Sequence, residues 1–140
     1  MDLSIFEKLE NRWNDNIEKH ISELNKELEP ITNSFNNLSV RFSIWRRLNS
    51  KNIINDITLE GFLGYSEIQG EWGLVIKTLE RDNKFGFVLK TDIEKLNGKN
   101  VFIKEAISEI PQILNDLDKA LEQHKRDLIK AKDAAVGLKS

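Results

Sequence analysis

The stretch Val40-Arg-Phe-Ser-Ile-Trp-Arg-Arg47 marks a change in the spacing of apolar residues along the chain. Here Val40, Phe42 and Ile44 alternate with polar or aromatic neighbours, which is the period of two expected for a strand with one buried face. Before this stretch the apolar residues recur every three or four positions, which is the period of a helix. The sequence therefore predicts that a helix gives way to a sheet at residue 40.

Three further apolar segments complete a predicted four-stranded sheet over residues 40–90. The second strand is expected around residues 57–65, the third around 72–81 and the fourth around 85–89. Parallel neighbours would need long crossover connections, and the links here are short. We therefore predict an antiparallel β-meander.

Turn-forming residues set the expected links between these strands. Asn49-Ser-Lys-Asn predicts the first turn, and Asp82-Asn83 predicts a tight hairpin. Gly61 and Gly64 are expected bulges or points of close approach within the second strand. Thr91-Asp-Ile-Glu94 has the spacing of a capping box, which predicts a short helical turn after the sheet.

The N-terminal segment, residues 1–31, predicts an amphipathic helix. Ser4 and Glu7 have the spacing of a capping box, which would satisfy free N–H groups at the helix start. The helix is expected to end near Glu29, because the residue before Pro30 is biased away from helical angles. Its apolar stripe consists of Phe6, Leu9, Trp13, Ile17, Ile21, Leu24, Leu28 and Ile31.

Residues 103–136 predict a second long helix, in which apolar positions alternate at steps of three and four. Pro111 fits the first turn of this helix if Ser108 caps it, and otherwise it would bend the helix. This narrow seam is typical of a coiled coil or a helix bundle. We expect it to form a helix interface through Leu114, Leu117, Leu121, His124 and Leu128.

These elements predict a single α+β domain over residues 1–140, with the order α-ββββ-α. A helix of about 25–30 residues is ~37–45 Å long, whereas a strand of about eight residues spans only ~27 Å. The helices should therefore extend beyond the sheet, in an antiparallel arrangement. Their apolar stripes must then cover each other or meet a second subunit, and we favour a homodimer through the long helices.

Composition excludes several kinds of chemistry. The 140 residues contain no cysteine, so disulfides, thiolate metal sites and cysteine nucleophiles are excluded. The start of the chain has no basic, apolar leader, and no apolar run approaches the ~20 residues that span a bilayer. We therefore expect a cytoplasmic protein without membrane contact.

Charge is spread unevenly although the net charge is only −2. Residues 1–35 carry four basic and eight acidic side chains, so their net charge is −4. Residues 119–140 carry six basic and three acidic side chains, so their net charge is +3. Nucleic-acid binding proteins usually carry a strong basic field, because contacts to phosphates supply most of their affinity. The charge balance therefore gives little support to such a function.

The inventory of catalytic residues is also poor. His20 and His124 both fall on helices, and the spacing supplies neither with a converging second ligand or base. The pairs Gly61/Gly64 and Gly70/Gly73 lack the Lys-Ser/Thr partner of a phosphate-binding loop. A hydrolase would need two converging carboxylates from the set Glu60, Glu67, Glu71 and Glu80, and nothing fixes their separation. We predict a protein that is not an enzyme and holds no cofactor or metal.

One constellation of basic and aromatic residues indicates a binding surface. The constellation consists of Arg41, Trp45, Arg46 and Arg47 on the first strand. In the alternating pattern Arg41, Trp45 and Arg47 share the strand face opposite Phe42, and the third strand can extend this face. Such a face can form a hot spot for a protein, or stack bases and clamp phosphates. The plainer alternatives are a charged edge strand that blocks aggregation and a tryptophan covered by a helix. The candidate binding residues are Arg41, Trp45, Arg47, Lys77 and Arg81.

The leading functional hypothesis is a non-catalytic protein-interaction module of the adaptor, chaperone-like or inhibitor/immunity type. This hypothesis follows from the apolar helical seam and from the lack of a recognisable set of catalytic residues in the sequence. The alternative is nucleic-acid or nucleotide binding by the Arg/Trp face of the first strand.

Overall fold

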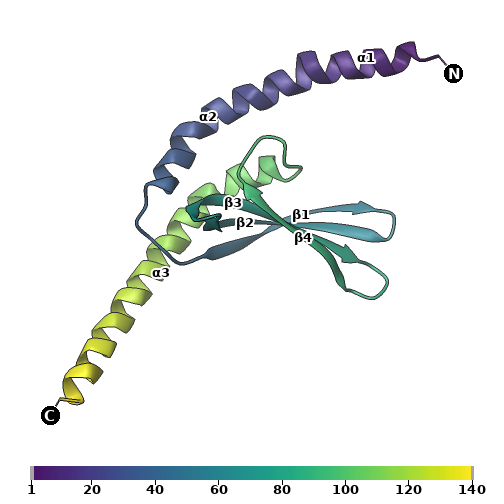
Figure 1. Cartoon of the computed structure of the whole chain (residues 1–140). Helices are drawn as coiled ribbons and strands as arrows, with labels where there is room; N and C mark the ends of the chain where they lie inside the picture. Colours follow the sequence, from purple (N-terminus) through teal and green to yellow (C-terminus); the bar gives the residue numbers. More distant parts are fainter. Residues whose placement is uncertain (1, 140) are drawn as a thin grey trace.

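The computed structural model describes residues 2–139 and confirms the predicted α+β class and the antiparallel meander. Each strand pairs with the next in the order β1-β2-β3-β4. The segments α1, η1 and α2 follow one another as a single curved helix, in which η1 is π-helical (Figure 1). The elements are α1 (Ser4–Arg12), η1 (Trp13–Ile17), α2 (Glu18–Asn36), β1 (Ile44–Ile54), β2 (Ile57–Ile68), β3 (Glu71–Asp82), β4 (Val88–Lys95) and α3 (Ile103–Gly137).

The first helix continues to Asn36, so the predicted end near Glu29 is wrong. Pro30 lies inside α2 and removes one backbone donor from the helix. Leu28 and Phe35, on either side of this proline, are both buried in the core. Their packing offsets the local preference of proline, which is why the helix does not stop there.

The predicted capping box at Ser4 and Glu7 does not form. The helix begins after Leu3, and no side chain caps it. Instead the Ser4 N–H donates to Oδ1 of Asp2 at 2.9 Å, and this hydrogen bond lowers the pKa of the Asp2 carboxyl. The acceptor thus comes from two residues upstream of the expected position.

The first hairpin turns later than expected. Asn49-Ser-Lys-Asn lies within β1, where the register shifts between Arg47 and Lys51. The chain reverses instead at Asn55, whose φ of 54° is a left-handed conformation that asparagine tolerates well. The turn-forming residues therefore lie in a β-bulge, and the predicted position of the first turn is wrong.

The last strand replaces the helical turn predicted at Thr91-Asp-Ile-Glu94. Thr91 pairs with Leu79 and Asp92 with Thr78, so this segment belongs to β4. Pairing along the whole edge of β3 satisfies more backbone groups than one isolated helical turn would. The sheet accordingly spans residues 44–95 rather than 40–90.

The core lies between one face of the sheet and the helices α2 and α3. Gly61 allows the Phe102 ring to approach β2, since a Cβ at this position would lie 2.7 Å from the ring. Tyr65 is buried, which raises the pKa of its hydroxyl, and it donates a 2.7 Å hydrogen bond to the Val40 carbonyl. The buried cluster consists of Leu28, Phe35, Leu48, Leu63, Tyr65, Leu74, Ile76, Leu96, Phe102, Ala106, Ile110, Ile113 and Leu117.

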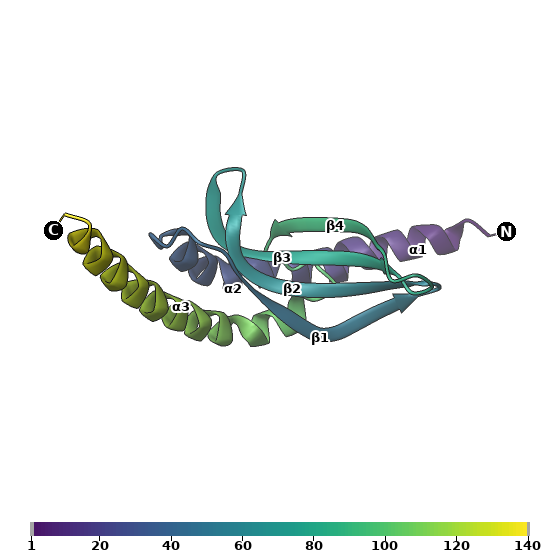
Figure 2. The ribbon, with the colours of Figure 1, turned by 90° about the horizontal axis from the view of Figure 1, so that it is seen from below.

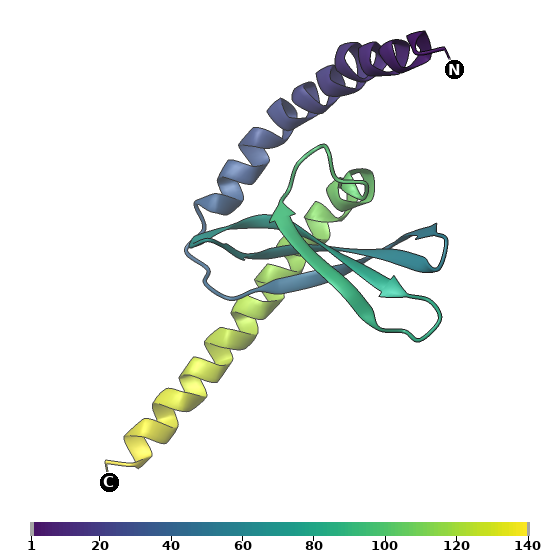
Figure 3. The same cartoon turned by 45° about the vertical axis from the view of Figure 1, so that its right-hand side comes forward.

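Both helices extend beyond the sheet, as predicted, but they do not run antiparallel or cover each other. They run in the same general sense, and the chain termini lie at opposite ends of the molecule (Figures 1, 2 and 3). The Gly98 N–H donates to Oδ1 of Asn25 at 2.8 Å, which holds the loop before α3 against α2. The last helix therefore starts beside α2 and runs away from the N-terminus.

Candidate functional site

The sheet face that points away from the core carries the aromatic–lysine cluster, defined as Trp45, Phe62 and Lys77. The register pairs Trp45 with Gly64 and Phe62 with Lys77 across neighbouring strands, so these side chains share one face. The Trp45 ring lies directly over Gly64, where a Cβ atom would overlap it. Lys77 Nζ lies 4.3 Å from the centroid of the Trp45 ring and 4.7 Å from that of Phe62. Both rings therefore stabilise this ammonium by cation–π contacts.

Glu60 neutralises two of the predicted binding cations. Its carboxylate is buried and lies 3.5 Å from Arg47 Nη2 and 3.2 Å from Arg81 Nε. Arg81 also donates to the Gly86 carbonyl at 2.9 Å. A buried carboxylate needs cationic partners, so these two guanidinium groups serve mainly to balance the charge of Glu60.

The four strand carboxylates considered for a hydrolase do not converge. Alternation along β2 and β3 places Glu60 and Glu71 on one face and Glu67 and Glu80 on the other. Glu71 forms an ion pair with Lys95 near the β2–β3 turn, and this contact lowers the pKa of the Glu71 carboxyl. A general acid would need the opposite shift, so the arrangement does not favour hydrolysis.

Arg41 lies apart from the cluster to which the sequence pattern assigned it. The residue precedes β1, and its guanidinium donates to the carbonyls of Leu38 and Val40 at 2.7 and 3.0 Å. The same group lies 5.9 Å from the ring centroid of Trp72, which packs against the core on the other sheet face. The structure brings Trp45, Arg47, Lys77 and Arg81 to one face but leaves Arg41 elsewhere.

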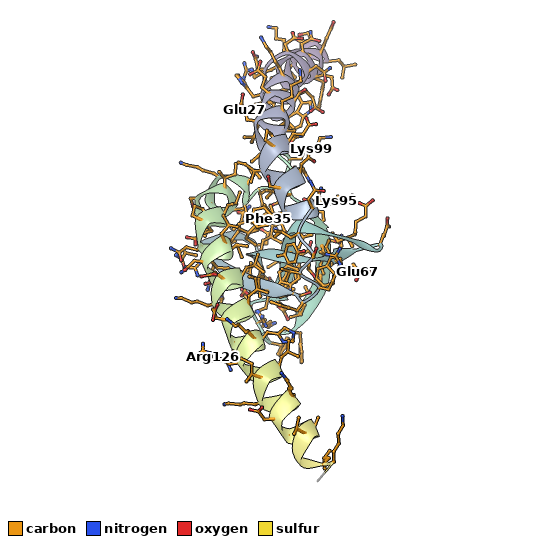
Figure 4. The ribbon with its side chains drawn as sticks, turned by 90° about the vertical axis from the view of Figure 1, so that its left-hand side faces the viewer. Glu27, Phe35, Glu67, Lys95, Lys99 and Arg126 are labelled. Atoms are coloured by element: carbon orange, nitrogen blue, oxygen red, sulfur yellow. The ribbon has the colours of Figure 1, made fainter. Side chains whose placement is uncertain are left out.

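The predicted helix-interface residues of α3 divide into two groups. Leu117 is 4% exposed and packs in the sheet core, whereas Leu114 is 52% exposed. Leu121 and Leu128 are exposed as well, and no described residue after Leu117 is buried. Figure 4 shows Phe35 between the helices and the sheet and Arg126 on the projecting part of α3. The seam is therefore covered by the sheet at one end and exposed at the other.

A shallow apolar depression, the α3 groove, runs along the start of this projecting part. We define it by Phe42, Leu121, His124, Leu128 and Ile129. The ring centroids of Phe42 and His124 are 6.1 Å apart, so the segment before β1 forms one wall. The sequence pattern singled out Leu121, His124 and Leu128 as interface residues, but it placed Phe42 within a strand. Phe42 instead precedes β1 and is only partly buried.

Arg46, which the sequence pattern grouped with the basic and aromatic residues of the first strand, positions α3 against β1. Its Nε lies 2.5 Å from Oε2 of Glu109, and its Nη1 lies 3.4 Å from Oδ2 of Asp116. The Glu109 contact is the main reason why the pKa of Arg46 is raised. The alternating pattern carries the signal: Arg46 is a charged residue on the face of Ile44 that α3 covers.

Metal ligands, membrane-spanning helices and similar proteins were the remaining guides to function. Among residues 2–139, no three His, Asp or Glu side chains are grouped as metal ligands. None of the helices in the described part of the chain combines the length and apolar character needed to cross a membrane. No protein-family model matches the chain, and no curated protein or solved structure is significantly similar to it.

Proposed function

We propose that the protein is a non-catalytic interaction module that binds protein through the projecting parts of its two long helices. One observation carries the proposal: both projecting parts bear apolar stripes that the rest of their own chain leaves uncovered. In the described segment before Glu18, α1 and η1 contain no buried residue. The exposed large apolar side chains of the two helices include Phe6, Leu9, Trp13, Ile17, Leu121, Leu128, Ile129 and Val136.

The energetics of helices favour docking of these stripes. A short isolated helix is only marginally stable in water, and helical segments in proteins depend on the packing of an apolar face. Burial of one large apolar side chain contributes about 1.5–3 kcal/mol. A partner that covers several of them therefore supplies the packing that the monomer lacks. Adaptor, chaperone-like and inhibitor proteins all act by such contacts.

The alternative, nucleic-acid or nucleotide binding by the sheet face, has weaker support. Arg47 and Arg81 are engaged by Glu60, and Lys77 is engaged by two rings. Phosphate binding would have to compete with these contacts within the chain. Exposed apolar stripes instead match the aromatic and aliphatic anchors of protein interfaces.

Site-specific photo-crosslinking in the native host tests the proposal. Leu9 or Leu128 is replaced by a photoreactive phenylalanine analogue, and Asn11 or Gln123 on the same helices serves as the control position. We expect irradiation to yield one discrete protein adduct from the two stripe positions and little from the controls. Equal labelling at all four positions, or no protein adduct, would contradict the proposal.

A further inference from the structure

The projecting N-terminal helix has the features of a docking helix. We define its N-terminal stripe by Phe6, Leu9, Trp13 and Ile17, which recur at steps of three and four. Phe6 is 53% exposed and Trp13 is 46% exposed, which is high for large side chains on one helix face. The projecting segment before Glu18 is also acidic, since residues 1–17 carry two basic and four acidic side chains and sum to 2 − 4 = −2.

The α3 groove has the opposite charge. Its apolar floor is bordered by Arg41, Lys125 and Lys132, and no acidic side chain among the described residues lines it. The surrounding segment, residues 119–140, sums to 6 − 3 = +3. The groove therefore suits an amphipathic helix that carries acidic residues, as in other helix-in-groove contacts.

The N-terminal stripe cannot reach the α3 groove of its own chain, because the two project at opposite ends of the molecule (Figure 3). Pairing of like segments from two copies would bring together two acidic helices or two basic ones. Pairing of unlike segments joins the −2 of residues 1–17 with the +3 of residues 119–140. Charge thus selects contact between the N-terminal stripe of one copy and the α3 groove of another.

We infer that the protein forms a two-fold homodimer in which the N-terminal stripe of each copy occupies the α3 groove of the other. Both helices run in the same general sense along the molecule (Figure 1). A two-fold rotation therefore sets the paired helices antiparallel and forms the same contact at both ends, so the assembly closes. The inference rests on the proposed function, because it names the protein that covers the projecting helices.

Sedimentation of the full-length chain at micromolar concentration is the first test. We expect the wild type to sediment at twice the 16.2 kDa of one chain. Trp13→Glu and Leu128→Glu each place a charge in the contact, and each should raise the dissociation constant at least about ten-fold. Phe85→Glu is the matched control, since Phe85 is 69% exposed on the β3–β4 turn, and it should leave the dimer intact.

Mixing the two contact variants is the decisive step. A mixed dimer of Trp13→Glu with Leu128→Glu contains one unaltered contact and one doubly altered contact. We therefore expect the mixture to associate more tightly than either variant alone. Contacts between like helices would give no such recovery, and that result would overturn the inference.

The remaining outcomes separate this inference from the proposed function. A monomeric wild type that still crosslinks to another protein overturns the second copy as occupant but leaves the proposed function standing. A monomeric wild type without adducts overturns both. Circular dichroism checks that the variants fold, and Leu9→Gln and Ile129→Gln repeat the test with milder changes.

Discussion

Single polar residues decide how α3 is seated on the sheet. The carboxylate of Glu105 accepts hydrogen bonds from the backbone N–H groups of Asn49 and Ser50, at 2.5 and 2.9 Å. These N–H groups belong to the bulged part of β1, which breaks the regular ladder with β2. A side chain from α3 thus satisfies donors that the strand pairing leaves free, and it ties the helix to the bulge.

The pKa of Glu105 makes this contact testable by pH. Partial burial raises the pKa, but the hydrogen bonds from Ser50 and Asn49 together outweigh that effect, so the pKa is lowered. A lowered folded-state pKa means that the stabilisation is present above the unfolded-state value, about 4.3, and is lost as the pH falls through the folded-state pKa.

We expect Glu105→Gln to lower the free energy of unfolding by about 1 kcal/mol at neutral pH. The difference in the free energy of unfolding between Glu105→Gln and wild type should become smaller as the pH falls below about 4. Chemical denaturation across this pH range measures it, and Glu122→Gln on the projecting part of α3 is the control. A difference that stays constant from neutral to acidic pH would show that the charge of Glu105 does not act in this way.

At the scale of elements, α3 consists of two parts with different partners. Its first half packs against β1 and β2 through Ile110, Ile113 and Leu117, whereas the second half extends beyond the sheet. The seam continues through both parts at the same spacing, with His124 as a polar member of the second part. The same sequence pattern thus serves a core in one half and an exposed surface in the other.

Leucine truncations in the first half distinguish core from surface. Leu117→Ala should lower the free energy of unfolding by about 2–5 kcal/mol, because it leaves a cavity under the sheet. Leu114→Ala, on the same helix but 52% exposed, should lower it by less than about 1 kcal/mol. Urea denaturation of both variants gives the comparison, and similar losses would contradict the described packing of α3.

At the scale of the whole molecule, the two projecting helices are the least covered parts of the chain. The sheet and the first half of α3 surround a continuous core, but α1 and η1 bury nothing. Local stability should therefore differ between these regions in a monomer. A dimer would remove the difference for the N-terminal helix.

Hydrogen exchange at several protein concentrations tests this coupling. Amide protection of residues 4–17 should rise with concentration in the wild type, because dimerisation covers this helix. In Trp13→Glu the protection should stay low, while amides of the buried strand residues Leu63 and Ile76 serve as a concentration-independent reference. Strong protection of residues 4–17 at every concentration, in both proteins, would mean that the helix is stable by itself.

The amino-acid sequence alone determined the types and the order of the main elements, two long helices that flank four strands. Helical and strand periods are local properties, and the short links between strands leave an antiparallel meander as the simplest pairing. Gly64 shows how far such reasoning reaches: the sequence predicts a bulge or a close approach there, and only the structure identifies the close approach and its neighbour, the Trp45 ring. The sequence therefore predicts roles that depend on residues close along the chain.

Tertiary packing decided the features that depend on which element covers which face. The helix α2 continues past Pro30 because Phe35 is buried in the core. Thr91 belongs to β4 because it pairs with the edge of β3. Pairing of Glu60 with Arg47 joins residues on neighbouring strands across the bulge in β1. The exposed half of the α3 seam has the same local spacing as the buried half. Local spacing specifies an apolar face, and only the three-dimensional arrangement supplies or withholds the surface that covers it.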